Sequence, residues 1–280
     1  MTTQSGYLLG ASTDERNRLI FQGEMFRSDT ERLLDRCDIR PGCRAVDIGC
    51  GPLGIVDLLA ERVGPGGEVT GLDHSAEMIE MARQSVAERG LGNVRLVQAD
   101  GGASGLEAGS YDFVHTRLVL MNVPDAAGVL AEMVSLARPG GTVAVQDVDW
   151  LTRVCEPPHP AWDRLRTAIA ELWRRNGMSV TIGRRLPGML RAAGLADVGV
   201  DASIRVFGHG HPYHGLLVSR AELCRSALLD HGLIGAAEFA ERVAELRAHL
   251  AEPSTIVLHP VLFQAWGTQP ARSGPPDRRA

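Results

Sequence analysis

One ten-residue stretch, AVDIGCGPLG at residues 45–54, constrains the fold more than any other part of the chain. Its first four residues have the apolar, β-compatible character of a buried strand, and three glycines then lead into a segment with helical spacing. Glycine tolerates positive φ and lets the backbone close on a ligand. The pattern therefore predicts a strand, a glycine loop and a helix, with Asp47 placing a negative charge where the strand ends. A glycine turn that serves geometry alone would give the same pattern.

Two more aspartates follow short β-like runs further along the chain. Asp73 ends the run VTGLD, and Asp100 ends the run VRLVQAD. The carboxyl ends of neighbouring parallel strands meet at one edge of a sheet, where an acidic side chain can bind the two hydroxyls of a ribose. The three aspartates together therefore predict a nucleoside site at that edge.

At these residues the sequence resembles the class I S-adenosylmethionine-dependent methyltransferases, over about residues 40–150. The resemblance implies an α/β fold with a doubly wound, mostly parallel seven-stranded sheet whose last strand is antiparallel. It also implies an N-terminal helical lid and a helical insertion before the last strand. The implied cofactor is S-adenosyl-L-methionine, with its methionine part against the glycine loop, its ribose on Asp73 and its adenine near Asp100. The family usually has a third glycine where this chain has Leu53, and Gly54 comes one place later.

The resemblance assigns cofactor contacts to residues of four successive segments. Cys50 is expected to line the loop and not to act as a nucleophile, and Met78 to lie near the adenine unless it is core filler. Arg117, with Thr116, is expected at the amino acid end of the cofactor, where an arginine can meet a carboxylate. An acidic substrate is the alternative partner of Arg117. The full set of predicted cofactor residues is Asp47, Gly49, Cys50, Gly51, Leu53, Gly54, Asp73, His74, Met78, Asp100, Gly101, Gly102, Thr116 and Arg117.

Two residues are candidates for a catalytic role in methyl transfer. His115 is predicted to follow the fourth strand beside the transferred methyl, and an imidazole suits proton removal at neutral pH. A histidine that only hydrogen-bonds at the strand end is the alternative. Asp149 ends the fifth strand, where a carboxylate could orient a hydroxyl or a cationic amine, or cap the turn that follows. If His115 is the base, its replacement by alanine would keep cofactor binding and slow turnover.

The acceptor pocket is expected between an N-terminal helix, near residues 12–37, and an insertion at about 208–252. Trp150 offers a flat apolar wall, and the aromatic and apolar residues of the N-terminal segment could cover the cofactor or merely pack on the sheet. His209, His211 and His214 have metal-like spacing without accompanying carboxylates, so no metal site is predicted. The predicted substrate residues are Tyr7, Phe21, Met25, Trp150, Tyr213 and His214.

Composition narrows the function classes. The net charge of −5 and pI near 6.0 argue against a surface for nucleic acid, and the partner expected is a small-molecule methyl acceptor. All 29 basic residues are arginine, which excludes a Walker A lysine, a Schiff-base lysine and a Tyr-x-x-x-Lys pair. The five cysteines show no CxxC spacing, and no apolar run reaches the length of a membrane span. With no signal-peptide pattern at Met1–Gly10, a cytoplasmic protein is expected.

We expect four segments along the chain. They are an N-terminal lid at 1–40, a cofactor-binding core at 41–150, the remaining strands with the insertion at 151–268, and a disordered tail at 269–280. The sixth and seventh strands are predicted at 197–207 and 254–267. Exchange of the N-terminal helix between subunits would give a homo-oligomer. The function expected is O-, N- or C-methylation of a small molecule, in secondary metabolism such as antibiotic biosynthesis. A protein that uses the cofactor structurally, or for another rearrangement, is the alternative. A nicotinamide oxidoreductase is disfavoured, because Asp47 precedes the Gly-x-Gly of the loop and the chain has no lysine for catalysis.

Overall fold

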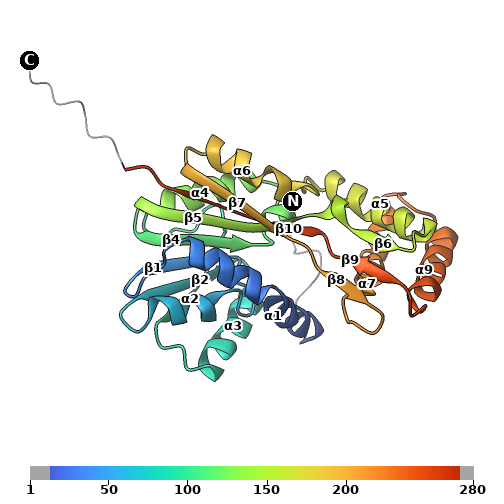
Figure 1. Ribbon diagram of the computed structural model, residues 1–280, viewed down its shortest axis with the longest axis horizontal. Helices are drawn as coiled ribbons and strands as arrows, with labels where there is room; N and C mark the ends of the chain where they lie inside the picture. Colours follow the sequence, from blue (N-terminus) through green and yellow to red (C-terminus); the bar gives the residue numbers. More distant parts are fainter. Residues whose placement is uncertain (1–12, 272–280) are drawn as a thin grey trace, which may run out of the picture.

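The structure is a computed structural model that describes residues 13–271. Tyr7 and the predicted tail from residue 272 onward lie outside the described residues. The chain begins with a long helix, α1 (Thr13–Arg36), that lies across one face of the main sheet (Figure 1). None of the described helices is both long and apolar enough to cross a membrane.

The main sheet has seven strands in the order β3-β2-β1-β4-β5-β10-β7. The first five are parallel, and β10 runs antiparallel to both β5 and β7. This confirms the predicted mostly parallel sheet with an antiparallel last strand. The strands are β1 (Arg44–Ile48), β2 (Glu68–Asp73), β3 (Val94–Gln98), β4 (Tyr111–Arg117), β5 (Ala137–Asp149), β7 (Ala196–Ser203) and β10 (Val261–Thr268).

Helices cover both faces of this sheet and form two hydrophobic cores. One core joins α1 to α2 (Val56–Val63) and α3 (Ala76–Glu88), and the other includes α4 (Ala126–Leu136) and α6 (Ile182–Ala192). Strand residues alternate between the two faces. Ala45 packs in the first core, whereas Val46 and Ile48 pack in the second.

Side-chain caps mark the starts of α3 and α4. The Ser75 hydroxyl accepts a hydrogen bond from the backbone N–H of Met78, and the Asp125 carboxylate accepts one from that of Gly128. Each cap satisfies a backbone donor that the first turn of a helix leaves without a partner. These caps fix where the helices begin relative to the carboxyl edge of the sheet.

A second, three-stranded antiparallel sheet was not predicted. It contains β6 (Val154–Glu156), β9 (Ile256–Leu258) and β8 (Val206–Gly208), in that order. The prediction of one continuous strand at 197–207 and another at 254–267 is therefore wrong in one respect. Each of these segments forms two strands, one in each sheet. The second divides at Pro260, which has no N–H to donate to a continuous ladder.

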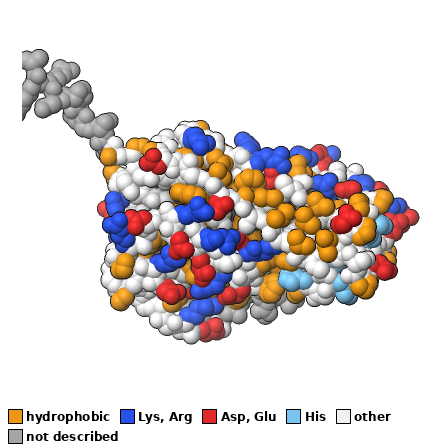
Figure 2. Space-filling view, in the orientation of Figure 1, with side chains coloured by type: hydrophobic (Ala, Val, Ile, Leu, Met, Phe, Trp, Pro, Cys, Tyr) orange, Lys and Arg blue, Asp and Glu red, His pale blue; other side chains and the backbone are white. Residues whose placement is uncertain are grey.

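The insertion helices lie beyond the main sheet, at the right of Figure 1, against the second sheet. In that view, Figure 2 shows apolar side chains gathered over this end of the molecule. Val154 of β6 and Val206 of β8 are exposed, and both pair with Leu258 of the central strand β9. The helices and short turns not yet named are η1 (Leu120–Asn122), η2 (Trp150–Thr152), α5 (Pro160–Arg175), α7 (Leu216–Leu223), α8 (Arg225–Asp230) and α9 (Ala236–Leu250).

Candidate active site

The glycine loop follows β1, and the Asp47 side chain holds it from the core side. Gly49, Gly51 and Gly54 all have positive φ, at 73°, 52° and 57°. The Asp47 carboxylate is buried and accepts a 3.1 Å hydrogen bond from the backbone N–H of Ile55, where α2 is about to begin. Asp47 therefore holds the loop from the core side, and a contact with the cofactor stays a prediction.

A side chain at Gly54 would make the closest steric clash in this loop. A Cβ at Gly54 would lie 2.2 Å from Oδ2 of Asp47 and 2.8 Å from the carbonyl oxygen of Cys50. We expect Gly54→Ala to lower the free energy of unfolding by about 3 kcal/mol or more, since positive φ strain adds to a clash with a fixed carboxylate. Gly90→Ala is the matched control, because Gly90 has a φ of 65° with nothing within 4 Å of the added atom. It should cost only about 1 kcal/mol in the same urea titration, and equal losses would contradict the clash.

Asp73 ends β2 and is bonded to the same loop. One carboxylate oxygen accepts from the Gly51 N–H at 2.9 Å, and the other accepts from the Ser75 N–H at 3.0 Å. His74 lies 3.3 Å from this carboxylate, which raises the pKa of the imidazole. Each carboxylate oxygen can accept more than one hydrogen bond, so Asp73 retains acceptor capacity for a ligand.

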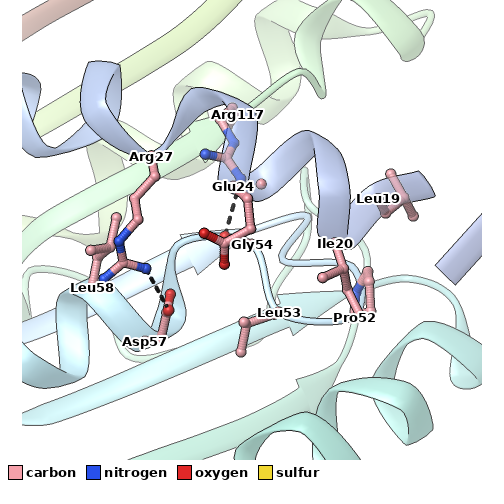
Figure 3. A pocket seen from close by; sticks show the side chains of 11 residues that line it. Leu19, Ile20, Glu24, Arg27, Pro52, Leu53, Gly54, Asp57, Leu58 and Arg117 are labelled. Atoms are coloured by element: carbon pink, nitrogen blue, oxygen red, sulfur yellow. Dashed lines mark hydrogen bonds and ion pairs between the residues drawn. The ribbon is translucent and has the colours of Figure 1, made fainter. Parts of the chain in front are cut away.

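A pocket lies between α1 and the glycine loop (Figure 3). A Cβ at Gly51 would point into space on this side, with Leu19 Cδ1 of α1 nearest at 4.0 Å. Gly23 of α1 lies beside Arg117, and a Cβ added there would be in ordinary contact with a terminal nitrogen of this arginine, at 3.5 Å. The lining residues are Leu19, Ile20, Gly23, Glu24, Arg27, Pro52, Leu53, Gly54, Asp57, Leu58 and Arg117.

Arg117 is one of two arginines that line this pocket. Its guanidinium donates to the Thr30 hydroxyl and to the Gly54 carbonyl, each at 3.1 Å. Among the described residues, no carboxylate forms an ion pair with it, whereas Arg27 in the same pocket pairs with Asp57 at 2.9 Å. Burial lowers the pKa of Arg117, opposed first by Asp47. A guanidinium held by neutral acceptors can bind an incoming carboxylate.

The other predicted cofactor residues divide between the ligand side and the core. Asp100 is exposed and accepts from the Gly102 N–H at 2.7 Å, and a Cβ at Gly101 would press on Ile48. Met78 is buried at the start of α3. Thr116 is also buried, and its hydroxyl donates to the Ile48 carbonyl, which points it away from the pocket.

Cys50 packs inward from the loop. Its side chain is buried in the core with α2, and its sulfur would lie 3.2 Å from a Cβ added at Gly71 of β2. Burial, with help from the charges of Asp47 and Asp73, raises the pKa of this thiol. A thiol that resists ionisation is not a nucleophile at neutral pH, and a contact of Cys50 with the cofactor stays a prediction.

His115 lies in a buried polar row beneath α1 and not in an open pocket. The side chain is fully buried, with Nδ1 2.8 Å from Asp47 Oδ1 and Nε2 3.1 Å from Gln146 Oε1. The Thr30 hydroxyl of α1 donates to the same Gln146 oxygen, at 3.0 Å. Both ring nitrogens are thus engaged inside the protein, which argues against direct contact with a methyl acceptor. A positioning role for the loop carboxylate Asp47 fits the geometry better.

Asp149 and Asp147 also have internal partners. Asp149 is buried, accepts from the Leu151 N–H at 3.1 Å and pairs with Arg184 of α6, so it caps η2. Asp147 accepts from the Met121 N–H at 3.0 Å, and burial raises its pKa to about 7. The capping alternative therefore describes Asp149 in this structure, and the predicted contact with an acceptor remains untested.

Part of the predicted acceptor wall does come together. Phe21 of α1 stacks on Tyr213 with ring centroids 5.4 Å apart, although the two are far apart in sequence. Met25 lies one turn further along α1 and is half-buried. His214 bonds the Thr255 carbonyl through Nε2 at 3.0 Å, and burial lowers its pKa, so it serves the insertion's own packing. No cluster of metal-ligating side chains occurs among residues 13–271.

Sequence reasoning missed two features of the site. The first is Gly23, whose signal was a glycine in the middle of a helical pattern, where it costs stability unless something approaches closely. The second is Arg153, which follows η2 and is buried against Trp150. Its position in a polar-looking connection, LTRV, gave no sign of burial.

Comparison with known proteins agrees with this geometry. Residues 39–187 match a family described as a methyltransferase domain. Nocamycin O-methyltransferase of Saccharothrix syringae is 40% identical over 122 residues, which are 44% of this chain and 44% of that protein. Demethylmenaquinone methyltransferase of Geobacillus kaustophilus is 41% identical over 111 residues, 40% of this chain and 47% of that protein. The chain thus spans about half the length of the curated relatives that it matches first.

A solved structure shares the fold. It is phosphoethanolamine N-methyltransferase 2 of Haemonchus contortus in complex with phosphomonomethylethanolamine and S-adenosylhomocysteine, at 18% identity and a TM-score of 0.53. The match covers 87% of this chain and 53% of that one. The family match, the strand order and the glycine loop lead to one assignment. The chain belongs to the class I S-adenosylmethionine-dependent methyltransferases.

Proposed function

We propose that the protein transfers the methyl group of S-adenosylmethionine to a small-molecule acceptor. The observation that carries this proposal is the pocket between α1 and the glycine loop, where Arg117 has no carboxylate partner among the described residues. The free amino acid end of the cofactor has a carboxylate that the Arg117 guanidinium can bind. The cofactor supplies an electrophilic methyl on a sulfonium, which a nucleophile displaces in line.

The residues present fit this cofactor at three positions. The open side of Gly51 leaves room for a ligand against the loop backbone. Asp73, with acceptor capacity remaining on both oxygens, would bind the ribose hydroxyls. Asp100 at the end of β3 is exposed to meet the adenine. We place Gly101, Gly102 and Met78 beside the adenine on the same grounds.

The contribution of the chain to catalysis is orientation and exclusion of water. Alignment of nucleophile, methyl carbon and sulfur can supply about 7–11 kcal/mol of barrier reduction without a covalent catalyst. Phe21 and Tyr213, stacked between α1 and the insertion, would close the pocket above the methyl. His115 would act on this site through Asp47 and the loop, as a positioning residue.

The acceptor class is supported by the relatives and by charge. Both relatives are named for small organic acceptors, one as an O-methyltransferase. The net charge of −5 disfavours a nucleic acid acceptor. We therefore propose O-methylation of a secondary metabolite as the first activity to test, with N- and C-methylation as the variants of the same site.

Calorimetric titration and a transfer assay test the function in two steps. S-adenosylhomocysteine should bind at micromolar concentration and NAD should not, because the chain belongs to the S-adenosylmethionine-dependent methyltransferases. Acceptors incubated with S-adenosylmethionine should then gain the mass of one methylene. Binding of NAD in place of the adenosyl ligand would refute the assignment. Adenosyl binding with no transfer to any acceptor would favour a protein that uses the cofactor in another way.

A further inference from the structure

Arg153 is a buried arginine without an acidic partner. Its side chain is 5% exposed, and its Nε has no hydrogen-bond partner. Within the described residues its guanidinium makes no hydrogen bond and no ion pair. Arg205 shows the usual solution in the same protein, because it pairs with the buried Asp29 and donates to the Met25 carbonyl. Burying a charge without such partners is costly, so the exception calls for a function.

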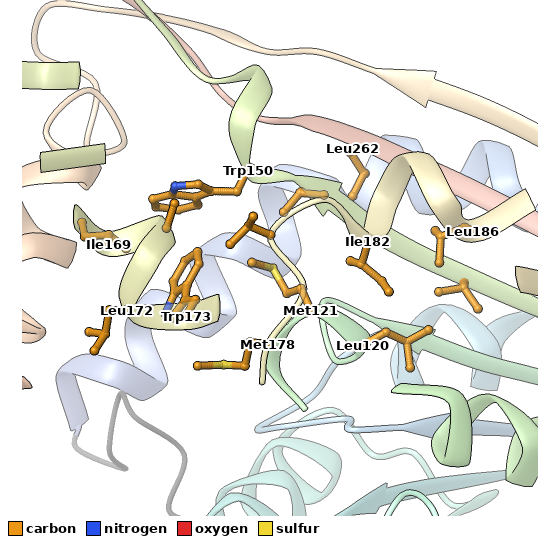
Figure 4. Close-up of a cluster of buried hydrophobic side chains, with 14 of the residues drawn as sticks. Leu120, Met121, Trp150, Ile169, Leu172, Trp173, Met178, Ile182, Leu186 and Leu262 are labelled. Carbon is orange, nitrogen blue, oxygen red and sulfur yellow. The ribbon is translucent and has the colours of Figure 1, made fainter. Parts of the chain in front are cut away.

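Trp150 forms one wall of this site. Its indole N–H is a second buried donor without a hydrogen-bond partner among the described residues. The guanidinium carbon of Arg153 lies 4.1 Å from the centroid of the Trp150 ring. The indole Nε1 of Trp150 is buried and has no hydrogen-bond partner. Figure 4 shows this indole above Trp173, whose ring meets it edge-on at 4.3 Å. Trp173 therefore fixes the indole, and the N–H remains available to an acceptor atom.

The charges around Arg153 are positive. Burial, followed by repulsion from Arg220 and Arg166, lowers the pKa of Arg153 to about 9. The Nε of Arg166 is also buried without a partner, while its terminal nitrogens bind the Leu151 carbonyl and Asp163. No carboxylate is among the groups that shift the pKa of Arg153. Neighbouring positive charges, together with buried N–H donors that have no partner among the described residues, favour an anion at this position.

This site lies on the acceptor side of the proposed pocket. Arg153 follows η2, which begins directly after the carboxyl end of β5. The Tyr213 phenol raises the pKa of both Arg153 and Arg117, so it lies within electrostatic range of both arginines. Phe21 stacks on the same phenol. An acceptor that contacts these rings would therefore lie between Arg117 and Arg153.

We propose that Arg153 and the indole N–H of Trp150 bind a carboxylate of the methyl acceptor. The identification of the ligand as the methyl acceptor rests on the proposed function. Binding of a carboxylate at this site does not depend on methyl transfer. A planar carboxylate can accept from Nε–H and a neighbouring N–H of one guanidinium, with the indole as a further donor. The acceptor is accordingly an organic acid with a flat or apolar body that fits against Trp150 and Tyr213.

The test is calorimetric titration of the full chain, saturated with S-adenosylhomocysteine, with benzoate and with its neutral analogue benzamide. Wild type should bind benzoate about tenfold or more tightly than benzamide, the worth of one charged hydrogen-bond pair. Arg153→Met keeps the aliphatic stem and should lose about tenfold or more in benzoate affinity. Arg174→Met removes an exposed arginine of α5 and should stay within about twofold of wild type.

Folding and cofactor binding are measured on the same variants. Arg153→Met should melt at or above the wild-type temperature, because it removes a buried charge that has no partner. Arg153→Lys keeps the charge without the planar fork and should bind benzoate more weakly than wild type. Equal benzoate affinity in wild type and Arg153→Met, no benzoate binding at all, or Arg153-dependent binding of inorganic phosphate alone would each overturn the carboxylate site. Failure of the homocysteine ligand to bind would instead refute the proposed function.

Discussion

Replacing Asp73 by asparagine is expected to weaken binding of S-adenosylhomocysteine by about 100-fold or more. The carboxylate would accept hydrogen bonds from two ribose hydroxyls, and each bond to a charged acceptor contributes about 1.5–3 kcal/mol. Two such bonds correspond to about 100-fold or more in affinity. The substitution also disturbs the loop, because the side-chain N–H₂ of asparagine would face the N–H of Gly51 or Ser75, which now donate to the carboxylate.

Calorimetric titration of purified wild type and Asp73→Asn measures this effect. Asp230→Asn is the matched control, since Asp230 is exposed on α8 and bonds only to Ser226 among the contacts of its side chain. The control should bind within about twofold of wild type. A dissociation constant for Asp73→Asn within about threefold of wild type would show that the ribose is held elsewhere.

The sheet and the cofactor loop could be predicted because their determinants are local. The glycine loop is set by a few consecutive residues, and it is present in the structure as expected. The mostly parallel seven-stranded sheet followed from the resemblance to a family, which supplies the long-range pairing that periodicity lacks. The second sheet escaped prediction, because a strand that passes from one sheet to another keeps the same alternation on both sides of the break.

The partners of the candidate catalytic residues depend on contacts distant in sequence. His115 ends the segment YDFVH, and its position at a strand's carboxyl end was predicted, but nothing local shows that Asp47 and Gln146 occupy both ring nitrogens. The burial of Arg153 likewise depends on Trp150 and on the insertion helices that close over it. The sequence pattern thus predicted which residues lie at the carboxyl edge of the sheet. It did not predict which groups their side chains contact.

The buried row beneath α1 also predicts how a variant of His115 behaves. Its Nδ1 and the Asp47 carboxylate are both buried at a separation of 2.8 Å, and the other Asp47 oxygen holds the Ile55 N–H at the end of the glycine loop. Removing a hydrogen-bond partner from a buried polar group costs about 1–3 kcal/mol, and more where that group is a carboxylate. We therefore expect His115→Ala to lower the free energy of unfolding by about that amount and to weaken cofactor binding through the loop.

A catalytic base would give a different pair of results. If His115 removed a proton from the acceptor, His115→Ala would bind S-adenosylhomocysteine as wild type does and lose only the single-turnover rate. Urea unfolding, calorimetric titration and single-turnover transfer, measured on the same variant, separate the two roles. His231→Ala is the control, because His231 is exposed at the end of α8 and its loss should change none of the three. Stability and affinity near wild type together with a lost rate would return His115 to the role of base, whereas a loss of both places its contribution in the Asp47 contact that shapes the loop.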